Sequence, residues 1–245
     1  MKRLGVFLSL VLLCGSLAAD VDDGDWRKIR QASERDDVST WVQPVPDNPL
    51  NAFKGEIEVP HPMERVMIVL GDIERFPEWV FQCDEAELRL DEWGPEIVRI
   101  KINGIWPVSD RDAVARSTIE QDPETLAITI RSFAEDGILA PQDGYVRIPS
   151  LDNLFVLTPL DDGWTRVTFR TFVDPGGAIP KWLANFVATR APLWTLQNMY
   201  KQMQHERYQE ADFVDFLLPF PGIEDLIMPS GHRIALADTD AVATP

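Results

Sequence analysis

The stretch DPGGAIPKWLANF, Asp174–Phe186, decides the fold of this chain. It opens with the turn residues Asp-Pro-Gly-Gly and continues as a helical pattern after Pro180, whose missing N–H donor costs least near the start of a helix. The pattern extends over residues 179–211, and Pro192 within it predicts a kink. A helix with so wide an apolar face must bury that face against another layer of the protein.

The segments before this turn supply the second layer. Apolar and polar residues alternate along several short runs, as they do in half-buried strands, and Asp161–Gly163 is typical of a hairpin turn. The strands follow one another through short turns without a strand–helix–strand rhythm, which indicates an antiparallel meander. The predicted strands cover residues 53–59, 88–90, 97–102, 112–119, 126–133, 145–148, 154–157 and 165–173.

Short helices are predicted ahead of and between these strands. The first has Trp26, Ile29 and Ala32 at helical spacing, and the second begins after Pro62. The fold class is therefore α+β, with a mainly antiparallel sheet and a long C-terminal helix. Prolines 44, 46 and 49 exclude regular structure around them. The predicted helices outside the last one cover residues 22–36, 63–70 and 77–81.

The first twenty residues differ from the rest of the chain. Lys2 and Arg3 precede the apolar run Leu4–Leu13, and small residues follow. This is the layout of a secretory signal, and the run is too short to span a bilayer core of roughly 30 Å. A short membrane anchor is the alternative. We predict a Sec-type signal peptide over residues 1–19, cleaved near Ala18 or Ala19, and export to the periplasm or otherwise out of the cell.

Charge and motifs exclude several functions. The formal net charge is −17, and loss of the signal peptide would make it two units more negative, which disfavours nucleic acid and attraction to anionic membranes. The three histidines show no metal-ligand spacing, and no nucleophile, phosphate-loop or dinucleotide motif is present. Cys83 has no local partner and is predicted to be a buried small hydrophobic residue. We therefore expect no enzymatic activity, no cofactor and no metal.

Three segments carry a resemblance to a known family. Ser109–Asp112 opens a strand like the family's Arg-Asp pair, Gly144–Arg147 resembles its strand after the omega loop, and Asp174–Asn185 is similar to its passage from last strand to last helix. The family is that of the START (steroidogenic acute regulatory protein-related lipid transfer) domains, and the chain resembles a bacterial, exported member over roughly residues 22–210. The resemblance implies a helix-grip fold, in which a curved antiparallel sheet wraps around the last helix.

The resemblance also implies a function. A hydrophobic ligand, a lipid, would lie in a cavity between the sheet and the C-terminal helix, for transport or sensing, with transient membrane contact. The lipid-binding domain would cover residues 20–212, and residues 213–245 would form a C-terminal extension. Two alternatives stay open, namely a helix-grip enzyme such as a cyclase or hydrolase of hydrophobic substrates, and an interaction module with a collapsed pocket.

Alternation and helical spacing predict which side chains face the cavity. Small residues along one face of the strand at 112–119 leave room for a ligand, and the last helix would cover it. The loop at 135–141 places two aliphatic residues where they could gate the cavity or touch a membrane. Core packing is the alternative for each. The candidates are Arg111, Ala113, Ala115, Ile130, Ile138, Leu139, Tyr145, Arg147, Phe155, Val167, Phe169, Trp182, Phe186, Arg190 and Leu193.

Three of these candidates are arginines on or beside apolar faces, where a guanidinium needs a partner or a route to water. A guanidinium suits the phosphate or carboxylate of a lipid headgroup. Alternatively, Arg190 extends to the surface, and Arg111 or Arg147 forms a salt bridge with Asp112 or another acid. The sequence leaves both interpretations open.

Overall fold

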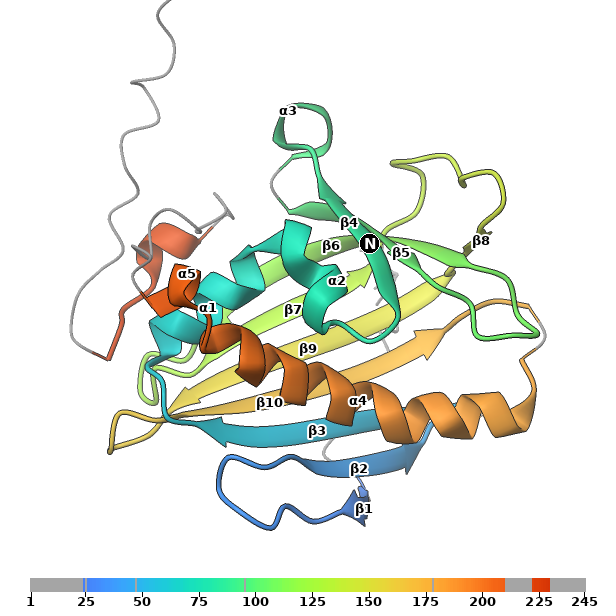
Figure 1. Cartoon of the computed structure of the whole chain (residues 1–245). Helices are drawn as coiled ribbons and strands as arrows, with labels where there is room; N and C mark the ends of the chain where they lie inside the picture. The colour runs from blue at the N-terminus through green and yellow to red at the C-terminus, as the bar shows by residue number, and fades with distance from the viewer. Residues whose placement is uncertain are drawn as a thin grey trace, which may run out of the picture.

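The computed structural model describes residues 24, 26–46, 48–94, 96–177, 179–209 and 222–229. The predicted signal peptide and most of the predicted extension lie outside the described residues. A ten-stranded sheet in the order β1-β2-β3-β10-β9-β7-β6-β5-β4, with β8 paired to β6, forms one layer. Every pair is antiparallel except β6 with β8. The long C-terminal helix lies on the concave face (Figure 1), which confirms the α+β helix-grip fold.

The observed strands follow the predicted ones closely over most of the chain. Each predicted run from residue 97 onward overlaps a strand, because alternation matches a sheet with one buried face. The strands are β1 (Arg27–Arg30), β2 (Ser39–Pro44), β3 (Asn51–Val59), β4 (Cys83–Leu88), β5 (Ile97–Ile102), β6 (Arg111–Gln121), β7 (Ile128–Ala134), β8 (Val146–Arg147), β9 (Ser150–Pro159) and β10 (Thr165–Asp174).

The prediction of a helix over residues 22–36 is wrong. Residues Arg27–Arg30 form β1, which pairs with β2 at the edge of the sheet, with Lys28 opposite Trp41. The guanidinium of Arg30 donates to Asp37 (2.7 Å), which ties the turn between the two strands. Helical spacing is a weak signal over so short a run, and pairing with a neighbouring strand overrides it. The strand β2 was not predicted, and the prediction that Pro44 excludes regular structure is wrong, because Pro44 is the last residue of β2 and lies opposite Asn51 of β3.

The shorter helices cover one end of the concave face. The prediction for residues 63–70 is confirmed. The helical turn predicted at 77–81 lies at residues 76–79, and residue 90 belongs to a helix and not to a strand. The long helix ends earlier than predicted, at residue 203, and a separate short turn follows. The helices are α1 (Met63–Gly71), η1 (Ile73–Arg75), α2 (Phe76–Trp79), α3 (Leu90–Trp93), α4 (Lys181–Met203), α5 (Glu206–Gln209) and η3 (Ile223–Asp225).

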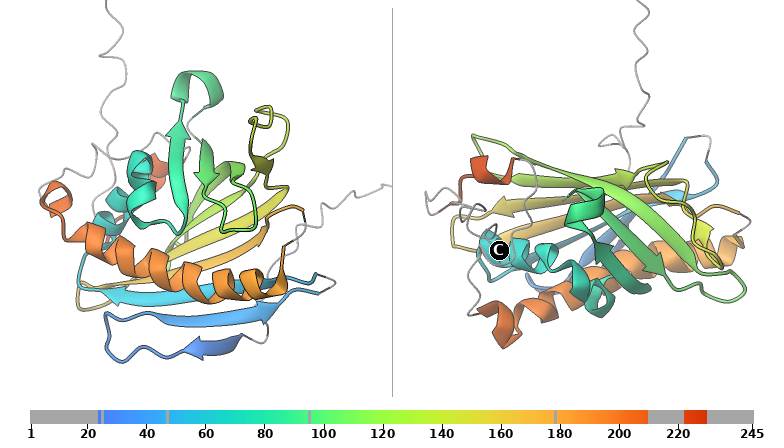
Figure 2. Two further views of the ribbon diagram at one scale, coloured as in Figure 1. Left: turned by 45° about the vertical axis from the view of Figure 1, so that its right-hand side comes forward. Right: turned by 90° about the horizontal axis from the view of Figure 1, so that it is seen from above.

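Close contact between α4 and the sheet depends on a glycine in β3. A Cβ atom on Gly55 would lie 2.7 Å from Cδ1 of Leu196 and 3.1 Å from Cβ of Pro192. Only a residue without a side chain allows the two backbones to approach this far. Figure 2 shows α4 lying along the concave face in both views, with the sheet curving around it. The kink predicted at Pro192 stays a prediction.

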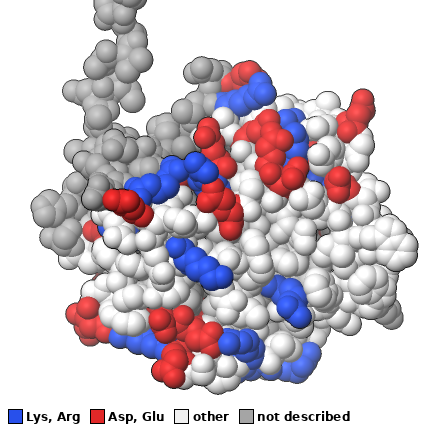
Figure 3. Space-filling view, in the orientation of Figure 1, with Lys and Arg blue, Asp and Glu red and all other residues white. Residues whose placement is uncertain are grey.

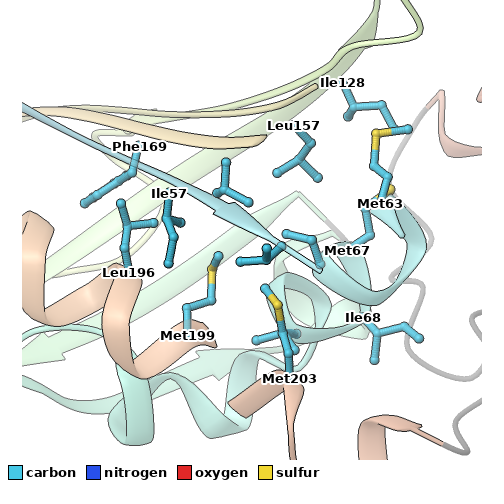
Figure 4. Close-up of a cluster of buried hydrophobic side chains, with 14 of the residues drawn as sticks. Ile57, Met63, Met67, Ile68, Ile128, Leu157, Phe169, Leu196, Met199 and Met203 are labelled. Carbon is cyan, nitrogen blue, oxygen red and sulfur yellow. The ribbon is translucent and has the colours of Figure 1, made fainter. Parts of the chain in front are cut away.

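The main core lies between the sheet and helices α1 and α4 (Figure 4). Leu196, Met199 and Met203 from α4 are fully buried there. The segment 222–229, from the predicted C-terminal extension, packs on the same core through Ile223, Leu226 and Met228. The part of the extension that the structure describes is thus integrated into the domain. No helix among the described residues has the length and apolarity that crossing a membrane requires.

Candidate functional site

A cavity of about 130 Å³ lies between the concave face of the sheet and the short helices. Strands β5, β6, β7, β9 and β10 form one wall, α1, η1 and α2 with the residue after it form the other, and α4 and the segment 222–229 contribute one residue each. The sheet wall consists of Val98, Ile100, Ala115, Ser117, Ile119, Ile130, Ser132, Leu151, Asn153, Phe155 and Phe169, and the facing wall includes Met67, Leu70, Phe76, Trp79 and Val80.

The register of the strands explains how these side chains meet. Ile119, Ile130, Phe155 and Phe169 lie opposite one another in successive strands, so their side chains form one apolar row. The rings of Phe155 and Phe169 stack, with centroids 4.6 Å apart, and the indole of Trp79 packs edge-on against Phe155 at 6.4 Å. Aromatic contacts of this kind hold a wall in place.

The next row toward the other end of the strands is polar. Ser117, Ser132, Asn153 and Thr171 lie directly opposite one another in β6, β7, β9 and β10. The hydroxyls of Ser117 and Ser132 are 2.7 Å apart, and the hydroxyl of Thr171 donates to Oδ1 of Asn153. The first three of these residues line the cavity, and none of its described lining residues is charged.

Four of the residues predicted from the sequence line this cavity: Ala115, Ile130, Phe155 and Phe169. Val167 and Leu193 belong to the main core instead. Ala113 packs in a neighbouring cluster with Ala115 and Leu151. The structure therefore brings together the strand candidates that share one face, whereas contact with a ligand stays a prediction for all of them.

The candidates at the start of α4 lie away from the cavity. Trp182 and Phe186 are 57% and 41% exposed. Arg190 is also exposed, and its guanidinium lies 5.6 Å from the ring centroid of Phe186. Of the two interpretations left open by the sequence, the structure therefore agrees with an Arg190 that extends to the surface. From α4, the cavity receives Thr195, whose hydroxyl accepts a hydrogen bond from the backbone N–H of Phe81 (3.1 Å).

Arg147 forms the salt bridge that the sequence left open. Its Nη2 and Nε lie 2.7 Å and 3.1 Å from the carboxylate oxygens of Asp112. Its Nη1 and Nη2 also donate to the backbone carbonyls of Leu139 and Ala140. The loop that contains Ile138 and Leu139 is thus attached to β6 through one guanidinium, and both side chains are half-buried, as is Tyr145.

Arg111 is buried and forms no salt bridge with a described residue. It is 7% exposed, and its only hydrogen bond to a described residue goes to the carbonyl of Ser109. Burial lowers the pKa of this guanidinium more than the negative charge of the neighbouring Asp110 raises it, which marks it as poorly solvated. It lies on the same face of β6 as Ala115, roughly 13 Å away along the strand. A buried, unpaired guanidinium is a suitable partner for an anionic group.

Sequence reasoning missed several lining residues. Ser132 and Asn153 share faces with Ile130 and Phe155 by strict alternation, so the same signal could have found them. Trp79 and Ile223 come from a short helix and from the segment 222–229, and no periodic pattern shows where such segments pack.

Two chemical features of the described residues concern metal binding and thiol reactivity. No group of His, Cys, Asp or Glu side chains in the described ranges is arranged to hold a metal ion. Cys83 is buried beside Ile73, Ala86 and Val98, and burial raises the pKa of its thiol to about 12. The thiol is therefore protonated at neutral pH and behaves as the small hydrophobic residue predicted.

Relatives of the chain share this architecture. A crystal structure of a STAR-related lipid transfer protein from Xanthomonas axonopodis has a TM-score of 0.65 and 30% identity, and the match covers 74% of this chain and 99% of that one. The crystal structure of human STARD10 has a TM-score of 0.63 and 21% identity, with 87% of this chain and 89% of that chain covered, and supports the fold alone.

Sequence comparisons agree. An uncharacterized protein of Pseudomonas aeruginosa is 30% identical over 176 residues, which are 71% of this chain and 85% of that protein. Human START domain-containing protein 10 is 26% identical over 258 residues, covering 91% of this chain and 84% of the human protein. Residues 15–208, well over half of the chain, match the START domain. The chain is a member of the START domain family.

Proposed function

We propose that this protein binds a lipid in the cavity between its sheet and its helices and carries it through water. The observation that supports this most is the cavity itself, whose walls are apolar except for one polar row. The similar protein of Xanthomonas axonopodis is named a lipid transfer protein, which agrees with this function. Burying apolar surface contributes about 25 cal/mol per Å² before ordering costs, so enclosing an acyl chain supplies useful affinity.

Ligand entry requires the cavity to expand. Its volume of about 130 Å³ is below the roughly 300–1,000 Å³ of sites that hold small molecules. The segment 222–229 closes part of the cavity through Ile223, and two hydrogen bonds between Gln121 and Ile227 hold it to β6. We propose that this segment moves when a lipid enters, as lids do in other binding proteins.

Contact with membranes would occur at the end of the molecule where α4 begins. The loop between β5 and β6 lies at that end together with the start of α4 (Figures 1 and 2). Trp106 in this loop is 85% exposed, and Trp182 is exposed in α4. Figure 3 shows a broad area without charged groups on the side where α4 begins. Tryptophan favours the membrane–water interface, so this end suits transient contact with an uncharged bilayer.

The function proposed is non-enzymatic. Among the described residues that line the cavity there is no carboxylate, histidine, cysteine, lysine or arginine. An enzyme acting on a hydrophobic substrate would need an acid–base pair within reach of that substrate. The composition of the walls therefore supports binding over catalysis.

The test is lipid uptake with a matched pair of variants. Ile130→Trp fills the cavity from β7, whereas Thr129→Trp adds the same ring on the opposite face of the same strand. We expect the unmodified protein and Thr129→Trp to take up lipid from vesicles, measured by mass spectrometry after extraction, and Ile130→Trp to take up at least tenfold less. Absence of uptake by the unmodified protein, or equal uptake by both variants, would refute the proposal.

We propose further that residues 1–19 direct export. The basic start, the apolar run and the small residues before Asp20 support this. In a bacterial host, the full chain should appear outside the cytoplasm with a mass lower by that segment. A chain that keeps residues 1–19 and stays in the cytoplasm would contradict the proposal.

A further inference from the structure

The polar row crosses the middle of an otherwise apolar cavity. Ser117, Ser132 and Asn153 lie between the row of Ile119 and Phe155 on one side and Ala115 and Leu151 on the other. A polar group in an apolar cavity is unfavourable unless it is hydrogen-bonded, because it loses its contacts with water. The polar groups of this row therefore need hydrogen-bond partners when a lipid fills the cavity.

The contacts within the row leave several hydrogen-bond donors unused. The pair of Ser117 and Ser132 uses one hydroxyl proton, and each hydroxyl carries one proton and two lone pairs. Thr171 donates to Oδ1 of Asn153, so the two protons on Nδ2 of that amide have no acceptor among the described residues. The row can therefore donate to an oxygen brought by a ligand.

A second unsatisfied donor lies on the facing wall. Trp79 lines the same cavity and is 1% exposed, and its indole N–H has no hydrogen-bond acceptor among the described residues. A buried N–H without a partner costs free energy, and such groups are rare in folded proteins. Both the sheet wall and the facing wall of the cavity thus carry hydrogen-bond donors that have no acceptor among the described residues.

The charges around the cavity limit what this oxygen can be. No cationic side chain lines the cavity among the described residues, and a buried anion without one is strongly disfavoured. The guanidinium of Arg111 lies roughly 13 Å along β6 from Ala115. The polar row therefore suits a neutral oxygen better than an anionic headgroup.

We propose that Ser117, Ser132 and Asn153 form a polar subsite for a neutral hydroxyl or carbonyl oxygen in the interior of an otherwise apolar ligand. Apolar walls on both sides of the row place this oxygen between two hydrophobic parts of the molecule and not at its end. The ligand class is an oxygen-bearing lipid, as opposed to a plain hydrocarbon chain. This inference rests on the proposed lipid-binding function.

The experiment uses probes that differ only at the interior of the chain. Vesicles of neutral phosphatidylcholine carry equal amounts of methyl stearate and a mixture of methyl 10- and 12-hydroxystearate, and the protein is incubated with them. Mass spectrometry gives the ratio of the two esters bound, corrected for their ratio in the vesicles. We expect the hydroxylated esters to be bound about five- to tenfold better, as a hydrogen bond in a desolvated site provides.

Variants assign this preference to the row. Asn153→Leu keeps the size of the side chain and removes the amide, and the double variant S117A/S132A removes both hydroxyls. Both should bring the ratio close to one while uptake of methyl stearate stays equal or rises. Thr118→Val, on the opposite face of β6 from Ser117, is the control and should keep the preference of the unmodified protein.

A measurement on the unmodified protein keeps the proposal testable if these variants do not fold. The indole N–H resonance of Trp79, assigned by its loss in Trp79→Phe, should shift with the hydroxylated esters and not with methyl stearate. Equal binding of both probes, or a preference that survives in Asn153→Leu and S117A/S132A, overturns the subsite and leaves lipid binding intact. If neither ester binds, the proposed function fails and the subsite with it.

Discussion

Arg147 and Asp112 form a two-point ion pair, with Nη2 2.7 Å from Oδ2 and Nε 3.1 Å from Oδ1, and the side chain of Asp112 is fully buried. The two residues come from neighbouring parallel strands, β8 and β6. Because the same guanidinium binds the carbonyls of Leu139 and Ala140, one contact fixes both the short strand β8 and the loop before it.

Loss of this guanidinium should destabilise the domain and release the loop. Arg147→Met leaves Asp112 buried without a partner, which costs about 3–5 kcal/mol. Denaturant unfolding should show this loss, and hydrogen exchange should rise at residues 135–141. The control is Glu92→Gln, which breaks an exposed pair with Arg89 and should cost less than about 1 kcal/mol. Equal losses of unfolding free energy in the two variants would show that the buried pair contributes no more to stability than the exposed one.

The approach of α4 to β3 should be sensitive to one methyl group. Gly55→Ala places a Cβ 2.7 Å from Leu196, so the helix must shift, at a cost of about 1–3 kcal/mol. In the background of Leu196→Ala the same change should cost less, because the clashing atom is gone. A double-mutant cycle in urea measures this coupling, and strict additivity would contradict the steric explanation. Glu56→Ala, on the other face of β3, should change stability by less than about 0.5 kcal/mol.

The segment 222–229 should open when the two hydrogen bonds that hold it to Gln121 are removed. The backbone N–H of Ile227 donates to Oε1 of Gln121, and Nε2 of Gln121 donates to the backbone carbonyl of Ile227, both at 2.8 Å. Gln121→Leu removes both bonds, and we expect faster hydrogen exchange in the segment together with stronger binding of an apolar fluorescent dye. The neighbouring variant Glu120→Gln should leave both unchanged. Unaltered exchange in Gln121→Leu would mean that apolar packing alone holds the segment.

Cys83 should resist thiol reagents in the folded protein. Burial raises the pKa of its thiol to about 12, so the reactive thiolate is scarce at pH 8. Ellman's reagent should react with this residue only after unfolding in denaturant, and the rate in the folded protein should report global opening. Rapid labelling of the folded protein at pH 8 would rule out the buried position described here.

Acid should loosen the N-terminal edge of the sheet. The hydrogen bond from Arg30 holds the pKa of Asp37 at about 2, below its ordinary 3.8. Because the folded pKa is depressed, this contribution to stability is present above pH 4 and is lost as pH falls toward 2. Asp37→Asn should lower stability at pH 6 and reduce its decline between pH 4 and 2, measured by thermal unfolding. A decline of unchanged steepness would assign the acid sensitivity to other carboxyls.

Alternation predicted most of the fold and part of the site. The sheet buries one face, so strict alternation placed Ala115, Ile130, Phe155 and Phe169 together before their pairing was known. Where structure depends on partners distant in sequence, the local pattern failed. Residues Arg27–Arg30 are helical by spacing but form a strand because β2 lies beside them.

Two further features lie beyond sequence patterns. From the sequence, Trp182 and Phe186 were expected to cover the cavity, but both side chains are exposed. Helix α4 approaches the sheet at Gly55, where Leu196 is the side chain that faces β3. A helix with apolar residues on adjoining faces does not show which face is buried. The sequence likewise identifies Arg111 as an arginine beside an apolar face. Only the three-dimensional structure shows that it forms no salt bridge with a described residue.

The position of Ile223 in the cavity wall has a consequence for how the protein matures. The sheet and α4 are complete once residue 203 has been made, but the wall at Ile223 is supplied by residues beyond the START match, which ends at residue 208. Because Ile223 is synthesised after the sheet and α4, the cavity is complete only when the chain has been made well past the end of the START match.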